Sequence, residues 1–466
     1  MAGALVLLGD DLRADDSPAL AAAAEGAQVV APLYVLEKGR VRGAALWWLG
    51  KALEDLERAL AEKGGRLFVM QGGQLACAKS AMASLGTRAV YLNAGVDAAR
   101  DAALIAALKA EGAEVHYFPQ SLRDESILAR EGGGYRVFTA YHKAAAKLEV
   151  RQPRGATPPF ESPAQLPRTV PVAEVAAHLE KGWTGRLASY WEPTAAGLAA
   201  QIALLPEILP HYAEERDWPF RVTTSRLSPY LRFGQIDPAR LVRIVAALPE
   251  GEGRETFLRE LNWREFARHC LAHHPDLPYE PLDKAFRAFP WRDDPAALKA
   301  WKKGRTGVPI VDAGMRQLWK TGWMHNRVRM ICASYLVKDL LIDWRLGAEW
   351  FMETLVDADE ASNALNWQWV AGSGPDAAPY FRVFNPLLQA RKFDPDGYYV
   401  RKFVRELAFL PAEWVHTPEK APVDVLADAE LPPGTYPEPL VDHRKARERA
   451  LKGLAGMREK VREVAR

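Results

Sequence analysis

Residues 323–330 read Trp-Met-His-Asn-Arg-Val-Arg-Met and open a segment whose apolar spacing predicts a helix from Asn326 to about Leu341. The same helical spacing recurs in the long segments around this stretch, and it predicts the fold of the second half of the chain. From about residue 206 onward, such segments are separated by loops such as 249–251 and 274–276. The pattern predicts an all-α half that ends in a charged helical tail at 442–466.

The first 125 residues follow a different pattern, in which apolar strand-like runs alternate with helix-like segments. Alternation of this kind predicts an α/β domain, with a parallel sheet flanked by helices. The predicted strands are 4–8, 28–36, 66–71, 89–93 and 114–118, and the predicted helices are 17–24, 44–63 and 98–111. No GxGxxG motif occurs in this part, which argues against a dinucleotide site of the usual kind.

Residues 126–205 are rich in glycine and proline and show no apolar period. This composition predicts a long connector draped over the surface. The sequence therefore predicts three parts: an α/β domain at 1–125, an interdomain connector at 126–205, and a helical domain at 206–466.

Composition narrows the class of protein. Hydrophobic residues make up 48% and charged residues 26% of the 466, as in a soluble globular protein. The net charge is only +2, but residues 221–330 hold 20 Lys/Arg against 12 Asp/Glu. This local excess is compatible with a phosphate-binding face, although a solvated helical surface explains it equally well. Three scattered cysteines and no membrane-length apolar run predict a cytoplasmic protein without disulfides or membrane contact.

Tryptophan is concentrated in the helical half, where nine of the 15 tryptophans fall between positions 263 and 369. Buried aromatic residues usually fill a core. This density also suits stacking on bases or on a flavin, and it suits a relay of electrons between indole rings. The sequence alone does not choose between these roles.

Glu260, Trp263 and Arg264 are spaced so that a carboxylate, an indole and a guanidinium share one helix face. A surface ion pair beside a half-buried tryptophan would have the same spacing. The residue types are also those of a site for a polar aromatic ligand.

Asn326, Arg329 and Met330 share a face in the same way. An amide, a fixed cation and a polarisable thioether suit a planar heterocyclic ligand, although Met330 could equally be a core residue. Asp357 and Asp359 could pair with Arg329 or accept hydrogen bonds from ribose hydroxyls. No histidine stands at ligand spacing from the two aspartates, so no metal site is predicted.

Residues 223–234 read TTSRLSPYLRFG and combine hydroxyl side chains with a proline where a helix can open. Hydroxyl groups and free backbone N–H groups at a helix start bind phosphate well. Ordinary helix capping by Ser225 or Ser228 is the simpler explanation of the same pattern.

Four runs together resemble the photolyase/cryptochrome family, and most of all its bacterial photolyases that repair cyclobutane pyrimidine dimers. They are TTSRLSPYLRFG, ELNWREFARH, KKGRTGVPIVDAGMRQLWKTGWMHNRVRMICASYLVKDLLIDWR and NWQWVAGSGPDAAPYFRVFNP. The resemblance extends over nearly the whole chain. It implies an N-terminal α/β antenna domain, a long connector and a helical domain that holds folded FAD.

The resemblance also implies roles for individual residues. The expected flavin-binding residues are Tyr212, Thr224, Ser225, Arg226, Leu227, Ser228, Arg264, Trp323, Asn326, Arg329, Asp357, Asp359 and Asn363, the last of which would face the flavin N5. The expected catalytic residues of the lesion pocket are Glu260, Trp263, Asn326, Met330 and Trp369. The expected electron relay is Trp367, Trp344 and Trp291. The expected contacts to damaged DNA are Glu260, Trp263, Arg327, Met330, Trp369, Arg382 and Lys392.

The implied reaction is the light-driven repair of pyrimidine dimers, a carbon–carbon lyase activity. Excited reduced FAD passes an electron to a lesion that has been flipped out of duplex or single-stranded DNA, and the electron returns after the dimer splits. The chain is expected to act as a monomer, without membrane contact.

A second, antenna chromophore is also implied, but its identity stays open. Only Asp11, Leu12 and Arg13 remain of the Arg-Arg-Asp-Leu-Arg run that many family members carry. The segment from Asn93 to Arg100 lacks the Asn-Glu pair expected near a folate. The alternatives are a folate bound differently, a deazaflavin, a second flavin, or no second chromophore.

Three rival functions fit parts of the same pattern. A cryptochrome would keep the fold and flavin but act as a blue-light receptor, and Glu260, Trp263 and Met330 together favour repair over that role. Repair of (6-4) photoproducts is disfavoured because the family uses a histidine pair where this chain has Asn326 and Met330. A flavin oxidoreductase that does not act on DNA is the third rival.

Overall fold

The structure is a computed structural model, and it describes residues 3–124, 134–376 and 381–464. The chain forms two compact units. The first unit comprises Met1–Pro210, Ser225–Pro275 and Val356–Ala361, and the second comprises His211–Thr224, Asp276–Leu355 and Ser362–Arg466. Both units are therefore assembled from segments that lie far apart in the sequence.

A five-stranded parallel sheet forms the start of the first unit, in the order β3-β2-β1-β4-β5. Its strands are β1 (Gly3–Leu8), β2 (Val29–Leu36), β3 (Phe68–Gln71), β4 (Ala89–Asn93) and β5 (Glu114–Phe118). In the central strand β1, Leu5 pairs with Ala31 on one side and Val90 on the other. The predicted parallel α/β arrangement is confirmed, since β1 and β2 are buried apolar runs that helices cover.

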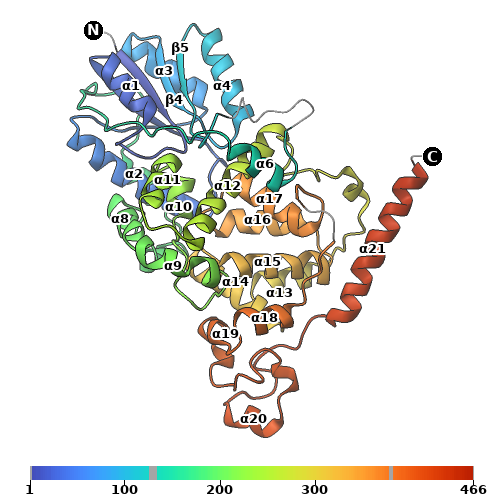
Figure 1. Ribbon diagram of the computed structural model, residues 1–466. Helices are drawn as coiled ribbons and strands as arrows, with labels where there is room; N and C mark the ends of the chain where they lie inside the picture. The colour runs from blue at the N-terminus through green and yellow to red at the C-terminus, as the bar shows by residue number, and fades with distance from the viewer. Residues whose placement is uncertain (1–2, 125–133, 377–380, 465–466) are drawn as a thin grey trace. The chain divides into compact units, whose positions relative to one another are not determined.

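Helices connect successive strands of this sheet: α1 (Pro18–Gly26), α2 (Ala44–Glu62), α3 (Gln74–Leu85) and α4 (Ala98–Ala110), all coloured blue in Figure 1. The apolar pattern did not predict α3. Its sequence, QLACAKSAMASL, is made mostly of small residues, so it has no strong apolar stripe. Ala78 and Ala81 nevertheless bury it against the strands.

The connector predicted at 126–205 contains short helices in the part that the structure describes, while residues 126–133 lie outside that part. The connector contains α6 (Phe138–Ala145), α7 (Val172–Leu179) and α8 (Ala195–Ala203). A Cβ on Gly50 of α2 would stand 3.1 Å from the Cα of Ala176 in α7, so the two helices pack with their backbones close. Short helices rich in alanine give too weak an apolar period to be seen in sequence.

The segment 225–275 folds onto the sheet's own unit and supplies α10 (Ser228–Arg232), α11 (Pro238–Ala246) and α12 (Glu252–His273). Trp48 Nε1 donates to Gln235 Oε1 at 2.8 Å. The Leu12 backbone N–H donates to Phe233 O at 2.9 Å. Gly234 has φ +58, and a Cβ there would stand 2.1 Å from Asp10 O, so only glycine fits between these segments.

The second unit is helical, as predicted. Its helices are α13 (Pro295–Lys302), α14 (Pro309–Thr321), α15 (Asn326–Ser334), α16 (Trp344–Thr354), α18 (Pro386–Phe393), α19 (Tyr398–Phe403), α20 (Val423–Asp428) and α21 (His443–Val464). Two helices, α9 (Leu205–Glu215) and α17 (Glu360–Ala371), span the division between the units.

Two predicted helical segments can be compared directly. The helix expected over 326–341 begins as predicted, but α15 ends at Ser334 and is followed by a π-helical stretch, Tyr335–Asp339. The charged tail is helical as predicted. Within the described ranges, no helix is both long enough and apolar enough to cross a bilayer.

Candidate functional site

The first unit brings the hydroxyl-rich run and the paired aspartates together. Ser228, at the start of α10, donates through Oγ to Asp357 Oδ2 at 2.6 Å. Arg232, at the end of α10, donates through Nε to Ala358 O at 2.7 Å. Two side chains of one short helix therefore hold the segment that carries Asp357 and Asp359, and both aspartates are buried.

Buried cations surround this segment. Arg232 donates through Nη1 to Asp10 Oδ1 at 2.6 Å, and Arg40 Nη2 lies 3.5 Å from Asp10 Oδ2. Although burial alone would raise it, the two guanidinium groups hold the pKa of Asp10 well below its usual range. Burial, with the charge of neighbouring Arg268, lowers the pKa of Arg264 to about 10, so Arg264 remains a cation at neutral pH.

The α12 helix presents Glu260, Trp263 and Arg264 at the predicted helical spacing. Trp263 stacks on Phe138 of α6, with ring centroids 3.7 Å apart and an interplanar angle of 9°. One face of this indole is therefore covered within the first unit. Arg264 donates to Glu265 at 3.1 Å and to Leu231 O at 3.1 Å, which fixes its guanidinium group.

In the second unit, α15 carries the predicted amide, cation and thioether. Asn326 Nδ2 lies 4.0 Å from Met330 Sδ, one turn along the helix. Arg329 donates through Nε to Met324 O at 2.7 Å, and its Cζ lies 5.8 Å from the ring centroid of Trp323. The interpretation that these groups share a helix face therefore agrees with their arrangement.

His325 caps α15 and was not predicted from sequence as a site residue. Its Nδ1 accepts a hydrogen bond from the Arg327 backbone N–H at 3.2 Å. Burial lowers the pKa of His325 to about 4, so the ring is neutral at pH 7 and can act as an acceptor. The side chain of Arg327 pairs with Asp217 and lies 4.5 Å over the ring of Phe393.

The α17 helix supplies Asn363, Trp367 and Trp369. Asn363 donates through Nδ2 to Ala348 O at 3.1 Å, which fixes the orientation of its amide. Trp367 is buried, and its ring lies edge-on to Phe351 at 5.0 Å and to Trp301 at 6.2 Å. Trp369 is only half-buried.

The predicted relay residues Trp367, Trp344 and Trp291 all lie in the second unit but do not stack on one another. Trp344 is buried beneath Arg345, whose Cζ lies 5.0 Å from the Trp344 ring centroid. Trp291 is half-buried, and its ring centroid lies 4.4 Å from that of Phe289. Among the described residues, no direct ring contact joins the three indoles, so a transfer along them would proceed in separate steps.

The other predicted site residues fall in both units. Tyr212 and Leu227 are buried, and Thr224, Ser225 and Arg226 are half-buried. Arg382 and Lys392 are exposed. Arg232 was missed from sequence, although an arginine inside the apolar run Tyr-Leu-Arg-Phe signals a buried partner.

These residues fit FAD by the chemistry of their polar groups. The first unit offers hydroxyl, guanidinium and carboxylate groups of the kinds that a pyrophosphate and a ribose require. The second unit offers a fixed amide, a neutral imidazole and indole rings, which suit a heterocyclic ring system.

Comparison with known proteins decides the family. Residues 4–164 match the family described as DNA photolyase, and residues 257–456 match the FAD binding domain of DNA photolyase. The deoxyribodipyrimidine photo-lyase of Agrobacterium fabrum is 43% identical over 472 residues, which cover 96% of this chain and 97% of that protein. The chain belongs to the DNA photolyase family.

Other members of the DNA photolyase family agree in fold. The crystal structure of a bacterial class III photolyase from Agrobacterium tumefaciens is 41% identical, with a TM-score of 0.93 and 98% of each chain covered. Cryptochrome-1 of Arabidopsis thaliana is 34% identical over 480 residues, which cover 96% of this photolyase-family chain and 69% of that protein. The α/β sheet and the helical FAD-binding domain expected from the sequence are therefore those of the family.

Proposed function

We propose that this chain is a deoxyribodipyrimidine photo-lyase, which uses light to split cyclobutane pyrimidine dimers in DNA. The observation that carries this proposal is its similarity, over nearly the full length of both chains, to a photo-lyase. The cryptochrome alternative is less favoured, because the chain is 43% identical to that photo-lyase but 34% identical to Cryptochrome-1. The cofactor is FAD, and a folate, deazaflavin or second flavin is the proposed antenna.

When bound in its reduced form, FAD supplies the electron that breaks the dimer after light is absorbed. Ser228, Asp357 and Asp359 would hold the phosphate and ribose part, and their positions are fixed by α10. Arg264 adds a positive charge whose direction is set by Glu265. Asn363 and Arg329 would hold the ring, and each is fixed by a hydrogen bond to a backbone carbonyl oxygen.

The lesion would be read by residues that stack on bases and donate hydrogen bonds. In its protonated form, Glu260 would donate to the pyrimidine carbonyl oxygens and so stabilise the charge that develops there. Trp263, Trp369, Asn326 and Met330 would complete the pocket. Because Phe138 covers one face of Trp263, the other face or the ring edge would meet the flipped-out bases.

Electrons that restore the reduced cofactor would pass along Trp367, Trp344 and Trp291. Contacts with the DNA backbone would come from Arg327, Arg382 and Lys392 and should weaken as salt rises. Arg327 already pairs with Asp217, so the two exposed cations would contribute more of this binding.

The proposal extends to organisation and location. The α/β segment 1–125 would carry the antenna, the connector 126–205 would join it to the catalytic part, and 206–466 would hold FAD and DNA. A monomer in the cytoplasm is proposed, and the three free cysteines agree with a reducing compartment. Size-exclusion chromatography with light scattering would test the monomer.

The decisive experiment illuminates the reduced protein with an oligonucleotide that contains one thymine dimer. Recovery of absorbance at the thymine band is expected, with none in the dark. Glu260→Ala should lower the repair yield while FAD content stays unchanged, because one preorganised donor is lost. Glu413→Ala, at an exposed position, is the matched control.

Full DNA binding without light-dependent recovery would contradict the proposal and favour a cryptochrome. Weak binding to DNA that does not respond to salt would favour a flavin oxidoreductase instead.

A further inference from the structure

Two buried side chains hold the start of α15, the helix that carries residues proposed for the lesion pocket. Gln317 of α14 accepts through Oε1 from the His325 backbone N–H at 3.2 Å. The same oxygen accepts from the Tyr399 hydroxyl group of α19 at 2.6 Å. Both side chains are buried, so water does not replace either hydrogen bond if it is lost. We refer to Gln317 and Tyr399 as the clamp.

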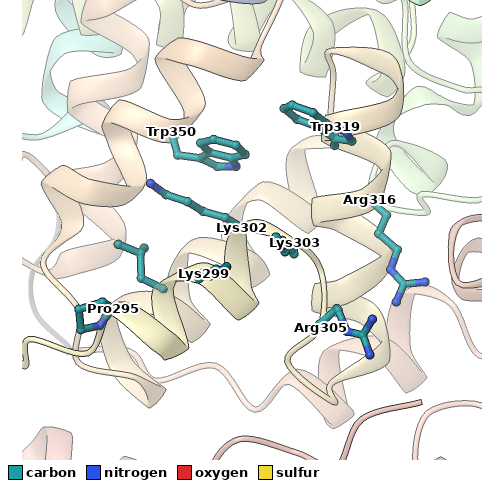
Figure 2. A pocket seen from close by; sticks show the side chains of 9 residues that line it. Pro295, Lys299, Lys302, Lys303, Arg305, Arg316, Trp319 and Trp350 are labelled. Atoms are coloured by element: carbon teal, nitrogen blue, oxygen red, sulfur yellow. The ribbon is translucent and has the colours of Figure 1, made fainter. Parts of the chain in front are cut away.

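The clamp lies on a different face of α14 from the one that borders the pocket shown in Figure 2. Arg316 and Trp319 line that pocket, whose volume is about 710 Å³. Successive residues of a helix point about 100° apart, and Gln317 is buried on another side of α14. Its amide group is therefore directed to α15 and α19 and not to the pocket.

Helix α15 is short, so its position depends strongly on the contacts at its start. It spans nine residues, and the first N–H groups of any helix have no partner within the helix. His325 caps α15 through Nδ1, which accepts from the Arg327 N–H at 3.2 Å. Gln317 holds the backbone of this cap. Asn326 and Met330 follow it and lie one turn apart, so a shift of the cap moves both side chains.

Tyr399 is itself fixed from the end of α18. Asp394 directly follows α18 and accepts from the Tyr399 N–H at 2.9 Å and from the Val400 N–H at 3.0 Å. Helix α18 carries Lys392, one of the cations proposed to contact the DNA backbone. A chain of hydrogen bonds therefore joins the end of this helix, through Tyr399 and Gln317, to the cap of α15.

We propose that Gln317 and Tyr399 are positioning residues for lesion recognition. They hold α15 in the place where Asn326 and Met330 meet the flipped-out dimer, while α18 brings Lys392 to the DNA backbone. The clamp acts through α15 and contacts neither the lesion nor FAD. Exact placement matters, because a displacement of about 1 Å can cost a binding group much of its effect. This inference rests on the proposed repair function.

Tyr399→Phe tests the clamp, because it removes one hydroxyl group and keeps the buried ring. Protein with FAD bound is titrated in the dark with an oligonucleotide duplex that contains one thymine dimer, and with the same duplex undamaged. The dissociation constant for the dimer should rise about 3- to 10-fold, the change that corresponds to one hydrogen bond. The affinity for undamaged duplex should stay the same, because the exposed Lys392 lies outside the clamp.

A second variant and a control separate positioning from stability. Gln317→Met removes the acceptor of both hydrogen bonds at similar volume and should weaken dimer binding at least as much as Tyr399→Phe. The double variant should bind the dimer no more weakly than Gln317→Met alone, since both changes break the same bond. Tyr436→Phe is the matched control. Its hydroxyl group is also buried and donates to Asp312 Oδ2 at 2.6 Å, but Asp312 holds Thr306 and not the cap of α15.

Three results would overturn the inference. One is dimer binding by Tyr399→Phe and Gln317→Met that equals that of the unaltered protein. Another is equal weakening by Tyr436→Phe. The third is a parallel loss of FAD or of affinity for undamaged duplex, which would assign the clamp to stability alone. A lack of preference for the dimer in the unaltered protein would instead refute the proposed function, and this inference with it.

Discussion

Replacing Arg232 by methionine tests whether the buried ion pair with Asp10 holds the first unit together. The guanidinium Nη1 lies 2.6 Å from Asp10 Oδ1, and Nε lies 2.7 Å from Ala358 O. Breaking a buried pair by removing one partner costs about 3–5 kcal/mol, because a charge is left in a poor solvent. Arg40, 3.5 Å from Asp10, still compensates part of that charge. We therefore expect the free energy of unfolding to fall by about 3 kcal/mol, the lower end of this range.

The contribution of the Asp10 ion pairs to the free energy of unfolding depends on pH. The pKa of Asp10 in the folded protein lies below the value of about 3.9 expected in the unfolded chain. Its ion pairs therefore stabilise the fold above about pH 4, and this contribution is lost as the pH falls further. Urea unfolding at pH 7, followed by circular dichroism and by release of FAD, measures the whole effect. Loss of FAD should accompany the variant, since Arg232 holds the segment of Asp357 and Asp359.

Arg240→Met is the matched control, because Arg240 pairs with Asp16 at 3.1 Å but its side chain is 55% exposed. An exposed pair contributes about 0–1 kcal/mol, so the control should unfold almost as the unaltered protein does. The double variant Asp10→Asn/Arg232→Met should cost clearly less than the sum of its single changes. The reasoning is refuted if Arg232→Met costs no more than Arg240→Met, or if the double variant is additive.

Three further predictions concern the second unit. Trp367→Phe should abolish photoreduction of oxidised FAD but leave repair by pre-reduced enzyme intact, as absorbance under blue light and the dimer assay would show; loss of both activities would end its assignment as a relay. Gly347→Ala should destabilise the protein by about 1–3 kcal/mol, because the new Cβ would stand 2.1 Å from Trp367 Cη2. Gly456→Ala, in open space on α21, is the control and should stabilise the protein by up to about 1 kcal/mol. Urea unfolding measures both changes. Burial raises the pKa of Asp394 to about 6, so the protein should lose stability as the pH rises from about 4 to 6 and this carboxyl group ionises. The melting temperature of Asp394→Asn should depend less steeply on pH in this range than that of the unaltered protein. Equal slopes for the two proteins would contradict the prediction.

Much of the fold could be predicted because local patterns carry it. The strands of the sheet are apolar runs, and four of the five were predicted to within one residue at each end. Helix α3 was missed because alanine and serine give no clear stripe. The helical half was predicted from its spacing, but the change to a π-helical stretch after Ser334 has no local signal.

The site was predictable only in part. Helical spacing correctly placed Glu260, Trp263 and Arg264 at neighbouring positions of one helix. It could not show that Phe138, 125 positions earlier, stacks on Trp263, because such a contact depends on the tertiary fold. The partners of Arg232 were hidden for the same reason, since Asp10 lies 222 positions away.

Because of long-range contacts, the compact units have other boundaries than the three parts predicted from the sequence. Arg151 of the connector pairs with Asp237 through two hydrogen bonds, at 2.9 and 2.6 Å. Composition identified residues 126–205 as a separate stretch, but it could not show that their charged and aromatic side chains are committed to partners in 225–275.

The close approach of Gly234 to the Asp10 carbonyl group has a consequence for how the protein can be divided into fragments. A recombinant fragment that stops at residue 205 would leave the Trp48 indole N–H and the Arg151 guanidinium without their acceptors on Gln235 and Asp237. Extending the fragment to residue 275 retains both acceptors and the close approach of Gly234. A fragment for the study of the α/β sheet in isolation should therefore extend to residue 275.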